Sequence, residues 1–218
     1  MIFTPRFDVL PPAQRELWPE LAAVPRRYVL YGGTALALRL AHRASLDFDF
    51  FAHDPLDHRE LEATLPFVKQ GETVQEGPNE RTLLAQRAGA SVKVSFFGGI
   101  SIGRVGDPET TGDGVVRVAS LLDLGGTKLK TLLQRVEAKD YRDIAALLER
   151  GVALAEILGA ARALFGTSFN PLVAQKALAY FEGGDLGTLG DDVRRRLTTE
   201  ATQDLRVVPL ALRSARLD

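Results

Sequence analysis

The stretch of sequence that decides the fold is residues 28–51, YVLYGGTALALRLAHRASLDFDFF. Its first four residues are apolar, with aromatic and β-branched side chains, which is typical of a buried β-strand. Gly32 and Gly33 end this run, because glycine adopts backbone angles that other residues avoid. The Ala- and Leu-rich residues 34–41 then predict a helix.

A second strand is predicted at the end of this stretch, over residues 46–51. The side chains of a strand point alternately to its two faces. Asp47 and Asp49 therefore lie side by side on one face. The opposite face carries three apolar side chains that we expect in the core, namely Leu46, Phe48 and Phe50.

These acids and the diglycine turn indicate two neighbouring binding sites. Close carboxylates repel each other unless a cation lies between them, and Mg²⁺ prefers oxygen ligands, so Asp47 and Asp49 are candidate Mg²⁺ ligands. A helix start favours an anion, so three residues are candidate phosphate-binding groups: Gly32, Gly33 and Thr34, the last also a possible N-terminal cap. Together the sites predict a bound nucleoside triphosphate with its metal. Two simpler interpretations stay open, a solvated outer sheet face for the acids and a plain turn for the glycines.

The spacing Gly-Gly-x13-Asp-Phe-Asp resembles the signature of the DNA polymerase β-like nucleotidyltransferases. The longer strings at residues 31–38 and 43–51 are similar to one branch, the AbiEii/AbiGii toxins of abortive infection. A second match, in residues 128–148, extends the resemblance to about residue 150. The resemblance covers these parts of the chain, and the remaining C-terminal residues carry no motif that we match.

The resemblance implies an activity and its partners. We expect a Mg²⁺-dependent, toxin-type nucleotidyltransferase that moves a nucleotide from a nucleoside triphosphate (NTP) to an RNA or protein acceptor, and a cognate antitoxin as a partner. It also implies that Arg43 and Ser45, which lie within the matching string, help to bind the nucleotide. The alternative is a degenerate, non-catalytic protein of the same fold, which binds nucleotides or has a regulatory role.

The alternative rests on a predicted strand over residues 91–97, one of three after the acidic pair, the others being 66–75 and 81–87. Polymerase β-like enzymes usually place a third carboxylate on such a strand, opposite the two acids. At the matching position this chain has Ser95, which carries no charge. Either the metal is held by the two acids and the nucleotide phosphates, or the protein binds without catalysing.

A helical region after residue 119 supplies further candidate residues. In the resemblance, Lys128 holds the triphosphate, and Asp140 or Asp143 helps to activate the acceptor. Arg135 lies two helical turns after Lys128, so we expect both on one helix face, with Arg135 as a further nucleotide-binding residue that points at the phosphates. The sequence alone does not choose between the two acids. A structural interpretation also stays open, in which they favour the start of a helix.

Composition limits the class of protein. The 218 residues are 45% hydrophobic and 25% charged, with a formal net charge of −1 and no cysteine. The charge argues against a protein that coats nucleic acid, although a local basic groove is compatible with it, and the lack of cysteine excludes disulfides and thiolate sites. There is no apolar stretch of membrane-spanning length and no signal pattern, so we expect a cytoplasmic protein without membrane contact.

The predicted fold is therefore α+β. A nucleotidyltransferase-like mixed β-sheet with flanking helices occupies residues 1–118, and a helical C-terminal domain occupies residues 119–218. Within the latter, apolar residues at helical spacing predict a bundle over three segments, 152–164, 170–182 and about 189–204.

Overall fold

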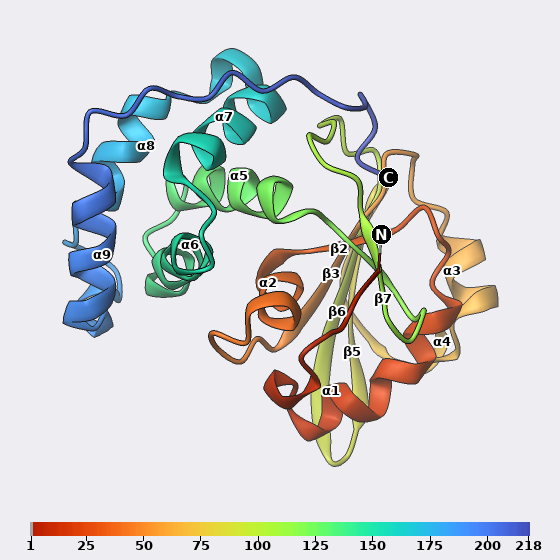
Figure 1. Cartoon of the computed structure of the whole chain (residues 1–218). Coiled ribbons are helices and arrows are strands. Elements are labelled where there is room, and N and C mark those ends of the chain that lie inside the picture. The colour runs from red at the N-terminus through yellow and green to blue at the C-terminus, as the bar shows by residue number, and fades with distance from the viewer. Residues whose placement is uncertain (1) are drawn as a thin grey trace. The chain divides into compact units, whose positions relative to one another are not determined.

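The acidic strand and the strand before the diglycine turn lie next to each other in the middle of a mixed sheet (Figure 1). The computed structural model describes residues 2–218. Within them the sheet has eight strands in the order β1-β7-β8-β2-β3-β6-β5-β4. Their bounds are β1 Ile2–Phe3, β2 Val29–Tyr31, β3 Asp47–Phe51, β4 Glu72–Gly77, β5 Glu80–Arg87, β6 Ala90–Phe97, β7 Glu109–Thr111 and β8 Arg117–Val118.

Helices lie on both sides of this sheet, with α2 on one side in Figure 1 and α3 and α4 on the other. Their bounds are α1 Pro12–Leu17, α2 Gly32–Leu40, α3 His58–Thr64 and α4 Pro66–Gln70, and a 3₁₀ segment, Trp18–Ala23, follows α1. Strand β3 pairs antiparallel with β2 and parallel with β6. Phe48 and Phe50 on β3 are fully buried, and Phe50 stacks on Phe96 of β6 with ring centroids 5.3 Å apart. The apolar face of β3 is thus part of the core, as its alternating pattern predicts.

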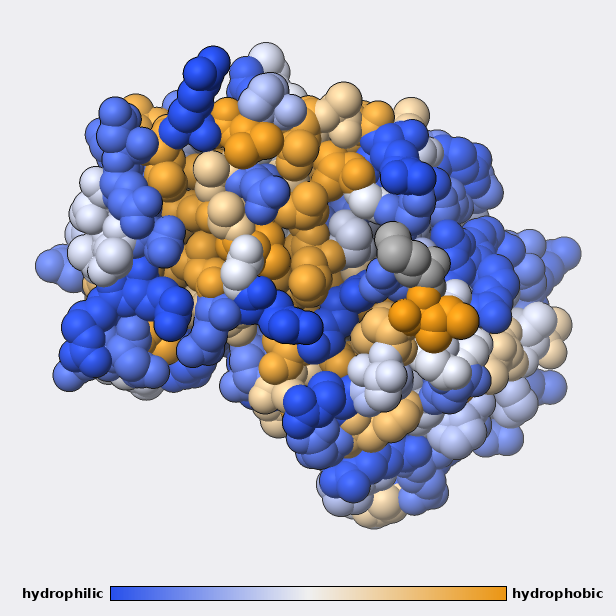
Figure 2. Space-filling model, in the orientation of Figure 1, coloured by the Kyte–Doolittle hydropathy of each residue, from blue (hydrophilic) through white to orange (hydrophobic). Residues whose placement is uncertain are grey.

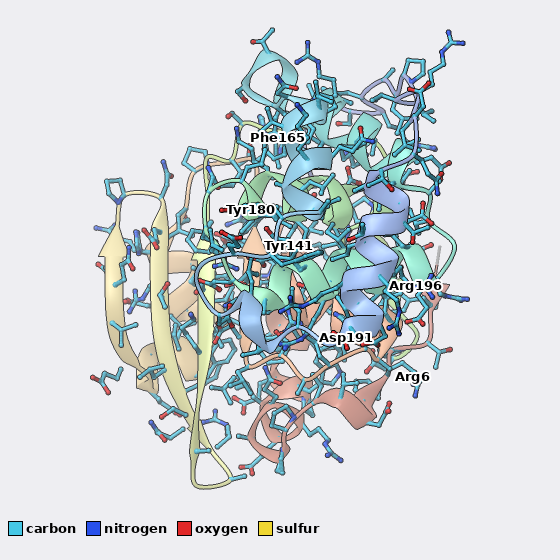
Figure 3. All side chains as sticks on the ribbon, turned by 90° about the vertical axis from the view of Figure 1, so that its left-hand side faces the viewer. Arg6, Tyr141, Phe165, Tyr180, Asp191 and Arg196 are labelled. Carbon is cyan, nitrogen blue, oxygen red and sulfur yellow. The ribbon has the colours of Figure 1, made fainter. Side chains whose placement is uncertain are left out.

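The C-terminal part consists of helices: α5 Leu121–Leu132, α6 Ala138–Glu149, α7 Leu154–Phe165, α8 Pro171–Leu178 and α9 Asp191–Ala201. Helix α5 packs against α6 and α7, and α9 packs against α6 and α8. In Figure 3, Tyr141 of α6 and Tyr180 lie close together, and the Tyr141 hydroxyl lies 3.3 Å from the carbonyl oxygen of Ala177. Figure 2 shows hydrophobic residues gathered over the part of the surface that α5, α6 and α7 form. The prediction of a mixed sheet with flanking helices and a C-terminal helical bundle is confirmed.

The chain forms two compact units. The sheet unit runs up to Gly103 and takes in Asp107–Ala119 and Ser214–Asp218, while the helical unit consists of Arg104–Gly106 and Ser120–Arg213. Asp123, in the first turn of α5, explains why a short loop segment belongs to the helical unit, because its carboxylate accepts hydrogen bonds from the N–H groups of Val105 and Gly106 at 2.8 and 3.1 Å. The predicted domains, 1–118 and 119–218, differ from these units in the placing of such short segments and stay a prediction.

Four local predictions from the sequence are wrong. Arg135 does not share a helix face with Lys128, because helix α5 ends at Leu132. Leu46 is 65% exposed, because the strand begins only at Asp47. Thr34 does not cap α2, which begins two residues earlier with Tyr31 at the cap position. The predicted strand 66–75 is in part helix α4, because Pro66 at the first helical position favours a helix start.

None of the helices in residues 2–218 combines the length and the hydrophobicity that a bilayer crossing requires.

Candidate nucleotide-binding and active site

The two acids of β3 lie on the face of the strand opposite the buried phenylalanines. Both are partly exposed, in contrast with their fully buried neighbours. In the parallel register Asp47 pairs with Lys93 and Asp49 pairs with Ser95 of β6. The Asp47 Oδ2 atom lies 3.0 Å from the Lys93 Nζ atom, so this carboxylate already has a cation next to it.

The diglycine turn packs directly against Asp49. Gly32 has φ +75°, and a Cβ atom at this residue would lie 2.7 Å from Asp49 Oδ2. A Cβ atom on Gly33 would lie 2.6 Å from Arg43 Nη2 and 2.9 Å from Ser45 Oγ. Any other residue at either position would displace these polar groups. The structure therefore brings together five of the predicted site residues at the start of α2.

Thr34 joins this group from inside the helix. Its hydroxyl donates to the backbone carbonyl oxygen of Asp47, which ties the first turn of α2 to β3. The helix begins with no side-chain cap at Tyr31. The N–H groups of a first helical turn have no partner within the helix, so an uncapped start favours an anionic ligand.

Ser95 lies where the sequence comparison expects a third acid. It is buried beside Asp49, and its Oγ atom accepts a hydrogen bond of 3.1 Å from the Thr82 hydroxyl of β5. Within residues 2–218 no group of three or more histidine, cysteine or acidic side chains is arranged to hold a metal ion. A metal at this site would therefore have Asp47 and Asp49 as its acidic ligands.

These two residues fit a hard divalent cation. They supply carboxylate oxygens from one face of one strand, and Mg²⁺ is usually held by one or two carboxylates together with waters and substrate phosphates. Partial exposure leaves room for such additional ligands.

The second group of predicted residues forms a cluster in the helical unit that is buried except for Arg135, whose side chain is 42% exposed. Lys128 Nζ lies 2.9 Å from Asp140 Oδ1 and 2.8 Å from Asp143 Oδ2. Arg135 donates to Asp140 from Nε at 2.9 Å and from Nη2 at 3.1 Å. Both acidic side chains are 0% exposed. The charges of Lys128, Asp140 and Asp143 are thus paired within the helical unit, and Arg135 also lies 3.5 Å from Glu137.

Asp140 is the centre of this cluster. Burial by itself raises the pKa of its carboxyl group, but the hydrogen bond from Arg135 and the charge of Lys128 outweigh burial, so the pKa lies below its ordinary value. Helix α6 has Glu137 at its cap position, with no side-chain cap. Asp140 therefore does not cap the helix, but it lies in the first turn, where an acid favours the helix dipole.

Two features of the site were missed by sequence reasoning. The strand pattern alone leaves Lys93 as either a surface lysine or a partner of phosphate, and it does not show that the parallel register of β6 and β3 puts Lys93 opposite Asp47. Lys128 was expected to face phosphates, but its ammonium group is already paired with two acids. Neither pairing has a local signal in the sequence, because both depend on how distant segments align.

Comparison with known proteins identifies the family of this chain. The model of the AbiEii family, described as nucleotidyl transferase toxins of type IV toxin–antitoxin systems, matches residues 20–206. The chain belongs to the AbiEii family. An uncharacterized protein of Aquifex aeolicus is 28% identical to this AbiEii chain over 159 residues, which is 71% of this chain and 74% of that protein.

Two solved structures share the fold of this AbiEii chain. The crystal structure of a candidate nucleotidyltransferase from H. pylori matches with a TM-score of 0.53 at 16% identity, over 86% of this chain and 89% of that chain. MenT4, a nucleotidyltransferase toxin of Mycobacterium tuberculosis, has a TM-score of 0.52 at 16% identity, with 88% and 82% covered. The suspected family relationship is confirmed, and with it the general class of nucleotidyltransferase toxins.

Proposed function

We propose that this chain is a Mg²⁺-dependent nucleotidyltransferase toxin that transfers a nucleotide from an NTP to an RNA or protein acceptor and is neutralised by a cognate antitoxin. The observation that carries the proposal is the packing of Asp49 against Gly32, with Arg43 and Ser45 against Gly33. This arrangement places a carboxylate, a guanidinium and a hydroxyl at an uncapped helix start, which suits a triphosphate with its metal.

The reaction is an in-line displacement at phosphorus. The hydroxyl oxygen of the acceptor forms a bond to the α-phosphorus and gives up its proton to water, the bond from that phosphorus to the bridging oxygen breaks, and pyrophosphate leaves. Mg²⁺ on Asp47 and Asp49 would neutralise charge that develops on the phosphate oxygens. Phosphate oxygens would be bound by the first-turn N–H groups of α2 and by Arg43 and Ser45.

The helical cluster has a separate place in the proposal. The family resemblance gives Lys128 a role in holding the triphosphate and gives Asp140 or Asp143 a role in activating the acceptor. Since both acids are fully buried and paired, we assign them the positioning of Lys128. A role in activating the acceptor would require this cluster to open.

The proposal is tested with α-³²P-labelled NTPs. The purified protein is incubated with Mg²⁺, each NTP in turn, and either total RNA or cell protein, and label in macromolecules is then challenged with ribonuclease or protease. We expect transfer of one nucleotide, and we expect Asp49→Asn to lower the rate by about a hundredfold or more. Glu72→Gln removes an exposed carboxylate elsewhere on the sheet and is the matched control, with an unchanged rate.

A second candidate function is favoured by the uncharged Ser95 beside Asp49. In this case the protein binds nucleotides and regulates a partner without catalysis. NTP binding in calorimetry with no transfer to any acceptor supports the second candidate and contradicts the first. Transfer that Asp49→Asn leaves intact contradicts the proposed site.

A further inference from the structure

Lys93 of the sheet unit lies at the proposed site but has no role in the reaction described above. It lies on β6 directly opposite Asp47, with 3.0 Å between Nζ and Oδ2. The two side chains are 43% and 41% exposed, so the pair is in contact with solvent. An ion pair of this kind is weak, and a stronger ligand readily separates it.

Two acidic and two basic side chains lie against the diglycine turn or against each other. The acidic side chains are Asp47 and Asp49, and the basic ones are Lys93 and Arg43. Ser95, where a third acid is expected, adds no charge. A divalent cation arriving alone would have to displace Lys93 from Asp47 and remain close to its ammonium group. A triphosphate adds several negative charges, which offset the repulsion between the cation and the ammonium group of Lys93.

We propose that Lys93 couples metal binding to nucleotide binding at this site. Without a nucleotide, the ammonium group of Lys93 pairs with the carboxylate of Asp47, which keeps the affinity of the site for a divalent cation low. When metal and nucleotide bind together, Asp47 becomes a metal ligand and Lys93 pairs with a phosphate oxygen instead. The inference rests on the proposed function, because it assumes that Asp47 and Asp49 hold the metal of an NTP complex.

The test measures binding of Mn²⁺, which suits carboxylate ligands as Mg²⁺ does, through the electron paramagnetic resonance signal of the free ion. The variant is Lys93→Met, which keeps the length of the side chain and removes its charge. With no nucleotide present, we expect Lys93→Met to bind Mn²⁺ about tenfold more tightly than the unmodified protein. In calorimetry without metal, it should bind a non-hydrolysable NTP analogue about tenfold more weakly.

Lys69→Met is the matched control, because Lys69 is an exposed lysine on α4 of the same unit. It should change neither affinity. The inference is overturned if Lys93→Met binds Mn²⁺ no more tightly than the unmodified protein, or if the unmodified protein binds Mn²⁺ equally well with and without nucleotide.

The two proposals fail separately. Coupled binding with no nucleotide transfer overturns the proposed activity and supports the role of Lys93. Nucleotide transfer in a protein whose Mn²⁺ affinity does not respond to Lys93→Met overturns only the role of Lys93.

Discussion

The sheet unit and the helical unit each contain a group of paired lysines and aspartates, but the two groups differ in their exposure. In the sheet unit, Asp47 and Lys93 are each more than 40% exposed. In the helical unit, Asp140 and Asp143 are 0% exposed, and the side chain of Lys128 is 8% exposed. Both groups contain a lysine paired with aspartate, so the difference between these pairs comes from burial.

This difference separates two roles. A carboxylate in contact with water changes partners at low cost, so a metal or a phosphate is able to replace its ion pair. A fully buried carboxylate loses its hydration on folding, and its protein partners must compensate for that loss. We therefore expect substitutions in the helical cluster to affect mainly stability, and substitutions on β3 to affect mainly binding and catalysis.

The largest effect on stability is expected for Asp140→Asn. The change leaves Lys128 and Arg135 without their shared anion, and removing one partner from a buried ion pair costs about 3–5 kcal/mol of the free energy of unfolding. Because Asp143 still pairs with Lys128, we expect about 3 kcal/mol, measured by urea denaturation. Asp204→Asn, on an exposed residue of the same unit, is the control and should stay within about 0.5 kcal/mol.

The pH dependence of the free energy of unfolding is a further test of this variant. The pKa of Asp140 is lowered in the folded protein, so its contribution to stability is present above the unfolded pKa of about 4 and is lost as the pH falls through the folded pKa. The difference between the unmodified protein and Asp140→Asn should therefore be constant near neutral pH and shrink below about pH 4. A difference that grows on acidification contradicts the assignment of Asp140 as a charged centre.

The next effect in size is expected for Gly32→Ala. Residues other than glycine pay about 1–2 kcal/mol in the left-handed region, and the new Cβ would lie within 2.7 Å of the Asp49 carboxylate. We expect this loss of stability together with a strong loss of NTP binding, because Asp49 has to move. Denaturation and calorimetry measure the two effects.

Gly89→Ala separates strain from displacement. Gly89 has nearly the same φ, +74° against +75°, but a Cβ atom there would meet nothing within 4 Å. The two variants should lose similar amounts of stability, and only Gly32→Ala should lose NTP binding. Equal binding by both would show that contact between the diglycine turn and Asp49 has no part in the site.

The parts of the fold that the sequence predicts best are those fixed by short-range patterns. Alternation along residues 47–51 places Phe48 and Phe50 in the core, because the period of a strand is set by backbone geometry. Leu46 was misplaced since the alternation alone does not say where pairing begins. In the same way, Pro66 begins helix α4, although the apolar residues that follow it are also compatible with a strand.

For the candidate site, the sequence predicts the contacts between residues close in the chain but not those between distant segments. Gly32, Gly33, Arg43, Ser45 and Asp49 lie close in sequence, and the structure brings them into contact. The partners of Asp47 and Lys128 come from segments 46 and 12 or more residues away, where strand register and helix packing decide the contacts. Burial decides which aspartates exchange partners, and it depends on the assembled fold.

The smallest effect on stability, expected for Asp47→Asn, is the most direct test of the contrast between the two groups. Asp47 is part of an exposed pair with Lys93, and exposed pairs contribute about 0.2–1 kcal/mol. We expect the free energy of unfolding to change by about 0.5 kcal/mol or less, while nucleotide transfer falls steeply. A double-mutant cycle with Lys93→Met measures the pair alone and should give a coupling in the same small range. If Asp47→Asn instead costs as much as Asp140→Asn, the acids of β3 are structural like those of α6, and exposure no longer distinguishes a binding site from a buried support.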